Sequence, residues 1–252
     1  MRSKRYDMSS MARTALVTGG SRGIGAAIAL RLAQDGADVA ITYVQDEAAA
    51  QAVVHKIEAT GRRGLALRAD ASDASAPGAA VGRAADHWGR LDILVNNAGV
   101  GVLGPIEGLS ADDVDRVLDV NVRAVFLASQ AAAARMERGG RIVSIGSCMA
   151  QHVPGPGGTL YAMSKSALTG LTKALARELG SRGITANLVL PGPIDTDMNP
   201  ADGPYADAQR ADTALDRFGS AEEVASLVAY LASEEAGYVT GTEVSVDGGH
   251  AA

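Results

Sequence analysis

The segment Ala15–Gly25 reads A-L-V-T-G-G-S-R-G-I-G, and the architecture of the chain follows from it. Its apolar start has the pattern of a buried strand, and the alanine-rich run after it, Ala26–Ala33, has the period of a helix. Strand, glycine turn and helix in this order suit a dinucleotide phosphate, because glycines admit the pyrophosphate and the helix N-terminus offers free N–H groups. The spacing T-G-x-x-x-G-x-G differs from G-x-G-x-x-G, and alone it is a weak signal.

Apolar runs alternate with alanine-rich helical patterns along the rest of the chain. The expected strands are 14–18, 38–43, 64–68, 93–95, 141–145, 185–190 and 243–246, and the expected helices are 23–34, 46–60, 75–88, 111–137, 161–181 and 221–232. This alternation predicts an α/β protein, a single-domain Rossmann-type doubly wound parallel sheet of about seven strands with helices on both faces. Segment 199–212 is expected to be a mobile flap over a substrate or a plain surface loop.

Tyr161 and Lys165 stand four residues apart at the start of a helical pattern, so their side chains share one face. A neighbouring cation favours the phenolate and lowers the tyrosine pKa from about 10 toward neutrality, which suits proton transfer. A shift of about three units needs roughly 4 kcal/mol, so a second positive centre such as a nicotinium ring is expected. The spacing alone also fits a surface helix with a lysine that reaches solvent.

Five further motifs follow in order. They are Asp70, the run Asn96–Gly99, Asn121, Ser147, and the run Pro191–Thr196. With the glycine turn and the Tyr161–Lys165 pair, these motifs make the chain resemble a short-chain dehydrogenase/reductase from about Arg13 to its end. Within that family it is similar to 3-oxoacyl-carrier-protein-reductase-like carbonyl reductases, in a subgroup with a branch described as cyclic-di-GMP-binding biofilm-dispersal proteins.

The resemblance implies a role for each motif. Tyr161 exchanges the proton, Lys165 binds the nicotinamide ribose and lowers the pKa of Tyr161, Ser147 bonds the substrate carbonyl, and Asn121 holds a water. Asp70 accepts from the adenine amino group. The implied cofactor-binding residues are Gly19, Ser21, Arg22, Gly23, Ile24, Gly25, Tyr43, Asp70, Ala71, Asn97, Ala98, Gly99, Tyr161, Lys165, Pro191, Gly192, Ile194 and Thr196. Plain turn-forming roles are the alternative for Ser147 and Asp70.

The second expected strand indicates which cofactor is used. An NAD-specific site places a carboxylate at the end of that strand, about 20 residues beyond the glycine turn. Here the strand ends in Thr42-Tyr43, and no carboxylate follows until Asp46. Arg22 stands inside the turn instead, and the planar fork of an arginine suits a 2′-phosphate. NADP(H) is therefore the expected cofactor, with a solvated surface arginine as the alternative.

Composition limits the class of protein. The 252 residues fit one domain, expected over 13–252 after a disordered extension at 1–12. A net charge of −6 and a pI near 5.2 argue against a nucleic-acid partner. The single cysteine, Cys148, excludes an intramolecular disulfide, fits a reducing compartment and is expected to be structural. No run of about 20 apolar residues is present, so a cytoplasmic protein that does not span a membrane is expected.

The four histidines, His55, His87, His152 and His250, do not have metal-ligand spacing, so no metal site is expected. A surface or loop position is expected for each, with the substrate mouth as an alternative for His152. The resemblance also implies a homotetramer in which helices 111–137 and 161–181 pair across a two-fold axis.

Three functions compete. The leading hypothesis is an NADPH-dependent reductase of a small-molecule carbonyl, either a 3-oxoacyl thioester or an activated ketone. The second is a binding protein that senses a cyclic dinucleotide in the same pocket, and the third is a degenerate structural homologue. The complete set Asn121, Ser147, Tyr161 and Lys165 favours the enzyme, because a pure sensor has no use for a proton-relay tyrosine.

Overall fold

The computed structural model describes residues 12–252 and contains one seven-stranded parallel sheet in the order β3-β2-β1-β4-β5-β6-β7. The strands are β1 (Thr14–Val17), β2 (Asp38–Tyr43), β3 (Gly64–Arg68), β4 (Ile93–Asn96), β5 (Arg141–Ile145), β6 (Thr185–Pro191) and β7 (Glu243–Val246). The predicted fold class is confirmed, and each strand ends within one residue of its predicted bounds. The extension expected at 1–12 lies outside the described residues, apart from Ala12.

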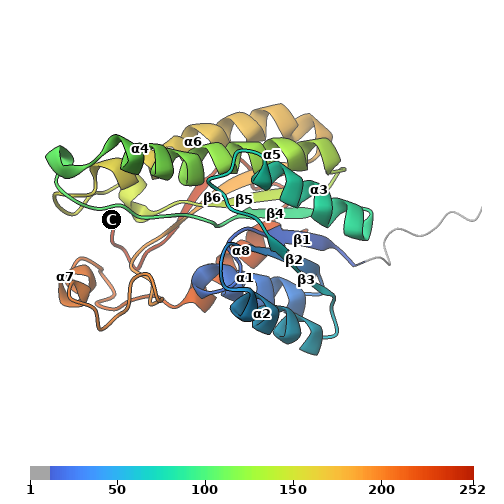
Figure 1. Cartoon of the computed structure of the whole chain (residues 1–252), viewed down its shortest axis with the longest axis horizontal. Helices are drawn as coiled ribbons and strands as arrows, with labels where there is room; N and C mark the ends of the chain where they lie inside the picture. The colour runs from blue at the N-terminus through green and yellow to red at the C-terminus, as the bar shows by residue number, and fades with distance from the viewer. Residues whose placement is uncertain (1–11) are drawn as a thin grey trace, which may run out of the picture.

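Helices cover both faces of this sheet, as Figure 1 shows, with α1, α2 and α8 on one face and α3 to α6 on the other. The α-helices are α1 (Gly23–Gln34), α2 (Glu47–Ala59), α3 (Ala76–Trp88), α4 (Ala111–Leu118), α5 (Ala124–Arg135), α6 (Thr159–Leu179), α7 (Ala206–Ala211) and α8 (Ala221–Ala232). The short helices are η2 (Ile106–Gly108), η4 (Cys148–Ala150), η5 (Gly180–Arg182) and the π-helical η3 (Asp119–Arg123).

The sequence of β1 shows why both faces are covered. Ala15 and Val17 belong to the core layer under α1, α2 and α8, while Leu16 between them belongs to the opposite layer, and all three are 0% exposed. Successive side chains of a strand point to opposite faces, so a strand that is apolar at every position needs helices on both sides. The polar motifs therefore collect where the strands end.

Two elements differ from the prediction. The helix expected over 111–137 is α4, η3 and α5 in succession, because five residues in its middle adopt π-helical hydrogen bonding. The loop expected over 199–212 contains α7, whose six residues are too few for apolar periodicity to reveal.

The combined run Ala111–Arg135 has the length and mean hydropathy (1.2) of a membrane-spanning helix. It lies within the domain, however, with α5 packed against α3 and with η3 and α4 against α6 (Figure 1). Its buried apolar residues, such as Val125 and Ala128, belong to the core layers of the sheet. The run is therefore accounted for as a core helix of an α/β domain.

Candidate functional site

The glycine turn after β1 is shaped for close approach by a ligand. Gly19 and Gly23 have φ angles of 64° and 53°, which favour glycine, and a Cβ on Gly25 would lie 2.4 Å from the carbonyl oxygen of Gly19. The first turn of α1 has neither a side-chain cap nor an acidic residue, so its N–H groups stay available to an anion. Ser21 and Ile24 are half-buried beside these groups.

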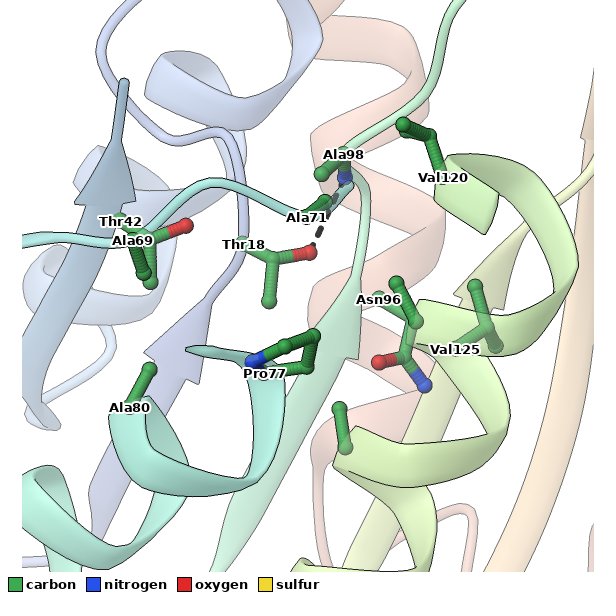
Figure 2. Close-up of a pocket in the computed structure, with 12 residues that line it drawn as sticks. Thr18, Thr42, Ala69, Ala71, Pro77, Ala80, Asn96, Ala98, Val120 and Val125 are labelled. Atoms are coloured by element: carbon green, nitrogen blue, oxygen red, sulfur yellow. Dashed lines mark hydrogen bonds between the residues drawn. The ribbon is translucent and has the colours of Figure 1, made fainter. Parts of the chain in front are cut away.

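Thr18 joins this turn to the Asn96–Gly99 run. Its hydroxyl accepts hydrogen bonds from the backbone N–H groups of Asn97 and Ala98, both at 3.0 Å, and Figure 2 shows the second of them. The Asn97 amide donates in return to the carbonyl oxygens of Thr18 and Gly19 at 2.9 and 3.1 Å. The ends of β1 and β4 are thereby fixed to each other before any ligand arrives.

A cavity of about 20 Å³ lies below this junction, between the strand ends and α3 and α5 (Figure 2). It is lined on one side by Thr18, Ala71 and Ala98, and on another by Asn96, whose buried side-chain oxygen has no hydrogen-bond partner among residues 12–252. Such a volume holds about one water molecule. The predicted cofactor residues Ala71 and Ala98 therefore share one small hollow at the C-terminal edge of the sheet.

The residues expected to select the cofactor differ in their contacts with the rest of the protein. Arg22 is exposed, and its side chain has no hydrogen bond or ion pair among the described residues. Tyr43 is buried at the end of β2, and the neighbouring Thr42 hydroxyl accepts from the Gly19 N–H at 2.9 Å. Asp70 is exposed and accepts from the Ser72 N–H and hydroxyl at 2.9 and 2.8 Å, so it forms a local turn.

The run after β6 meets the glycine turn from across the sheet. A Cβ on Gly23 would lie 3.6 Å from the Thr196 side chain, so these two predicted cofactor residues are neighbours. Pro191 and Ile194 are buried, and Gly192 packs so tightly that a Cβ there would lie 2.6 Å from the Cα of Asp247. The structure thus brings the first and last cofactor motifs together.

We call the four predicted catalytic residues, Asn121, Ser147, Tyr161 and Lys165, the catalytic corner. Ser147 follows β5, and its hydroxyl lies near the phenol of Tyr161, where its hydrogen-bonding influence lowers the pKa of that phenol. Desolvation is the larger influence, however, so the pKa of Tyr161 is raised overall from its usual value. The lowering expected from Lys165 is not seen in the protein alone, which keeps the phenol protonated at neutral pH.

Lys165 lies deep in the corner, only 5% exposed, and its ammonium donates to the Ile145 carbonyl oxygen at 3.0 Å. The ammonium is 5.7 Å from the centre of the Tyr161 ring. Burial lowers the pKa of Lys165 to about 8, because water no longer solvates the charged form. A lysine with such a pKa is ready to exchange a proton near neutral pH.

Asn121 is held by its side chain in the π-helical turn. Its amide oxygen accepts from the Val100 N–H at 2.9 Å, while its amide nitrogen donates to the Val100 carbonyl and to the Ser164 hydroxyl at 2.9 and 3.0 Å. The Ser164 hydroxyl in turn donates to the Tyr161 carbonyl at 2.8 Å. Sequence reasoning missed Ser164, although its position three residues after Tyr161 places it on the same helical face.

Gly99 lies next to two residues of the corner, Lys165 and Asn121. A Cβ at this position would lie 3.3 Å from the Lys165 ammonium and 3.4 Å from the Asn121 amide oxygen. The absence of a side chain thus leaves space beside the two polar groups. The predicted cofactor run Asn97–Gly99 and the predicted catalytic residues consequently form one continuous site.

The arrangement suits proton transfer beside a bound dinucleotide. Two neighbouring hydroxyls, those of the buried Ser147 and the half-buried Tyr161, are positioned to hydrogen-bond one substrate oxygen, and Lys165 supplies positive charge behind them. Cys148 is buried and its pKa is raised to about 11, so its thiol is neutral and unreactive. Within residues 12–252, His, Cys, Asp and Glu side chains form no group of three that could hold a metal ion.

Known proteins similar to this chain cover almost all of it. Residues 19–251 match the family model described as enoyl-(acyl carrier protein) reductase. A cyclic-di-GMP-binding biofilm dispersal mediator protein of Escherichia coli is 47% identical over 94% of this chain and 96% of its own length. The 3-oxoacyl-[acyl-carrier-protein] reductase FabG of Staphylococcus aureus is 40% identical, with 95% and 98% covered.

A solved structure extends the comparison to the fold. The short chain dehydrogenase from Burkholderia cenocepacia in complex with NADP is 58% identical to this chain and superposes with a TM-score of 0.94. The match covers 95% of this chain and 98% of that one. The sheet and all the helices that position the site are therefore shared with a protein crystallised with a dinucleotide.

Proposed function

Because the chain belongs to the short-chain dehydrogenase/reductase family, we propose that it reduces a carbonyl compound to an alcohol with NADPH. The observation that carries this proposal is the catalytic corner, where the phenol of Tyr161 meets the Ser147 hydroxyl and the buried Lys165 ammonium lies 5.7 Å from the phenol ring. Relatives named as reductases, such as FabG of Staphylococcus aureus, support the same activity.

The proposed mechanism assigns one task to each residue of the corner. When bound, the nicotinamide supplies the hydride. The Ser147 hydroxyl hydrogen-bonds the substrate oxygen and opposes the negative charge that develops there. Tyr161 gives its phenolic proton to that oxygen as general acid. Lys165 then stabilises the phenolate, and Asn121 holds α6 and the loop after β4 in register.

The cofactor fits the residues that are present. The uncapped start of α1 and the tight glycines offer N–H groups to the pyrophosphate. Arg22 is free to bind a 2′-phosphate, and Gly192, Ile194 and Thr196 would hold the nicotinamide end. The Burkholderia cenocepacia relative, solved with NADP, supports this choice.

A panel of ketones tests the activity directly. Purified protein with NADPH should reduce at least one α-keto ester, diketone or 3-oxoacyl thioester, followed by the loss of NADPH absorbance. A panel without any turnover would contradict the proposal.

A second function is favoured by one observation, the Escherichia coli relative whose name describes cyclic-di-GMP binding. The same glycine turn and Arg22 would bind such a ligand. Calorimetry distinguishes the two functions, since a sensor should bind the cyclic dinucleotide at micromolar concentration or below, about −8 kcal/mol. Binding of that strength without reductase activity would reverse the ranking.

We also propose a homotetramer, with α5 and α6 forming one of its two-fold interfaces. Phe126 on α5 and Met163 on α6 support this assignment, since they are 50% and 49% exposed apolar side chains on neighbouring helices. Light scattering at micromolar concentration should report four chains, and a monomer would contradict it.

A further inference from the structure

The C-terminal segment, residues 247–252, lies between three parts of the site. Its Asp247 packs against Gly192 in the expected nicotinamide run. The Gly248 carbonyl accepts from the Leu215 N–H at 3.1 Å, and a Cβ on Gly249 would lie 2.7 Å from the Ala214 side chain. Leu215 and Ala214 follow α7, so the segment is wedged against the base of the predicted flap.

His250 points from this segment toward the loop that begins at Ser147. Its ring centre is 5.5 Å from that of His152, and the two rings meet edge to face. The backbone N–H of His152 donates to the Cys148 carbonyl oxygen at 3.0 Å, which fixes His152 only one turn beyond Ser147. His152 and His250 are 98 positions apart in the sequence, since 250 − 152 = 98. Their rings therefore meet beside the catalytic corner.

The His250 ring has an unused polar atom. The side chain is 7% exposed, and its Nδ1 has no hydrogen-bond partner among residues 12–252. Buried polar atoms in folded proteins are nearly always paired, so an exception calls for an explanation. A ligand atom that enters beside the loop after Ser147 is one such explanation.

The surroundings indicate what kind of ligand atom this is. Two histidines without a third metal-ligating group are a poor metal site. The Cys148 thiol is neutral, with its pKa raised to about 11, and the Asp247 carboxylate already accepts from the Gly249 and Ala251 N–H groups at 3.0 Å. Each imidazole carries at least one N–H donor, so the pair can offer an N–H to an uncharged acceptor oxygen.

We infer that His250, supported by His152, hydrogen-bonds a second acceptor oxygen of the substrate and selects oxo esters over simple ketones. This inference rests on the proposed carbonyl reductase activity and adds a specificity-determining residue to it. The reacting carbonyl stays with Ser147 and Tyr161, while the ester oxygen reaches the histidine pair. A site built to bond a polar group discriminates against a substrate that lacks it.

Two substrates of equal chain length test the inference. Ethyl 3-oxobutanoate carries the second carbonyl, and 2-heptanone replaces it with methylene groups. For His250→Phe, which keeps a ring but removes both nitrogens, the ratio of kcat/KM values for ester and ketone should fall about three- to tenfold. His250→Gln, which restores a donor, should recover much of the ratio. The matched control His55→Phe, on an exposed face of α2, should leave it at the wild-type value.

A second readout does not depend on turnover. In nuclear magnetic resonance spectra, ethyl 3-oxobutanoate should shift the His250 ring signals, and 2-heptanone should leave them in place. An unchanged ratio in His250→Phe, or equal ratios in the Phe and Gln variants, would overturn the inference. If the wild type reduces neither ketone, the proposed function fails, and the ring signals alone decide the role of His250.

Discussion

The catalytic corner and the cofactor-selecting residues differ in how much of their bonding the protein itself provides. Asn121 makes three hydrogen bonds to backbone and side-chain partners, and Lys165 is buried against a carbonyl. Arg22, by contrast, is exposed, and within residues 12–252 its side chain contacts no acceptor. The corner is therefore assembled in advance, whereas the guanidinium of Arg22 is left available for contacts with a ligand.

Loss of the proton donor should give the largest effect. Tyr161→Phe keeps the ring packing and removes the hydroxyl, so turnover should fall by about 10²- to 10⁴-fold, while NADPH affinity barely changes. Steady-state kinetics and a fluorescence titration of NADPH measure the two quantities. The control Tyr230→Phe, on the exposed side of α8, should keep wild-type turnover. Substantial activity in Tyr161→Phe would show that the corner is not the site of proton transfer.

Removal of the buried ammonium should separate activity from stability. Lys165→Met should abolish turnover yet unfold at higher denaturant concentration at pH 7. The lysine pKa lies near 8 in the fold against an ordinary 10.5, a cost of about 3 kcal/mol, offset by about 1 kcal/mol for the lost bond to Ile145. The net gain is about 2 kcal/mol.

The pH dependence of that gain has a definite sign. Below pH 8 the lysine is charged in both the folded and unfolded states, so its full cost is present. Between pH 8 and 10.5 the unfolded chain binds the extra proton, so wild-type stability rises with pH and the advantage of Lys165→Met shrinks. A pH-independent difference in the free energy of unfolding would contradict this account.

The exposed Arg22 is expected to give a smaller effect that depends on which cofactor is bound. Arg22→Ala should weaken NADPH binding about ten- to a hundredfold and leave NADH nearly unchanged, because a charged hydrogen bond contributes about 1.5–3 kcal/mol. Arg83→Ala, an exposed arginine on α3, serves as the control. Equal weakening of both cofactors would remove the 2′-phosphate from the assignment of Arg22.

The smallest effect is expected at Asp70. Asp70→Ala should weaken NADPH about three- to tenfold, the value of one hydrogen bond to adenine at an exposed position where water competes. Asp73→Ala is a closely matched control, because Asp73 accepts from the Ser75 N–H and hydroxyl just as Asp70 does from Ser72. If both variants lose the same affinity, Asp70 acts only by shaping its turn.

Strand patterns made the fold predictable, since most strands contain a short apolar run and most motifs follow a strand end. The site was predictable where a residue type carries the chemistry, as with the Tyr161–Lys165 pair. The raised pKa of Tyr161 was not, because burial depends on packing from distant segments such as Gly101. The position of His250 beside His152 likewise depends on the path of the C-terminal segment, which no local pattern specifies.

The π-helical turn at Asp119–Arg123 changes the rotational register between the two α-helices that it joins. The turn contains one extra residue. The side chains of α5 are therefore rotated by about 100° from the directions that an unbroken continuation of α4 would give them. Deleting a single residue from this turn would leave a longer and more regular helix while rotating one side of it relative to the other. Either Asn121 or the core residues of α5 would then face the wrong way, so local regularity and a working site are incompatible in this helix.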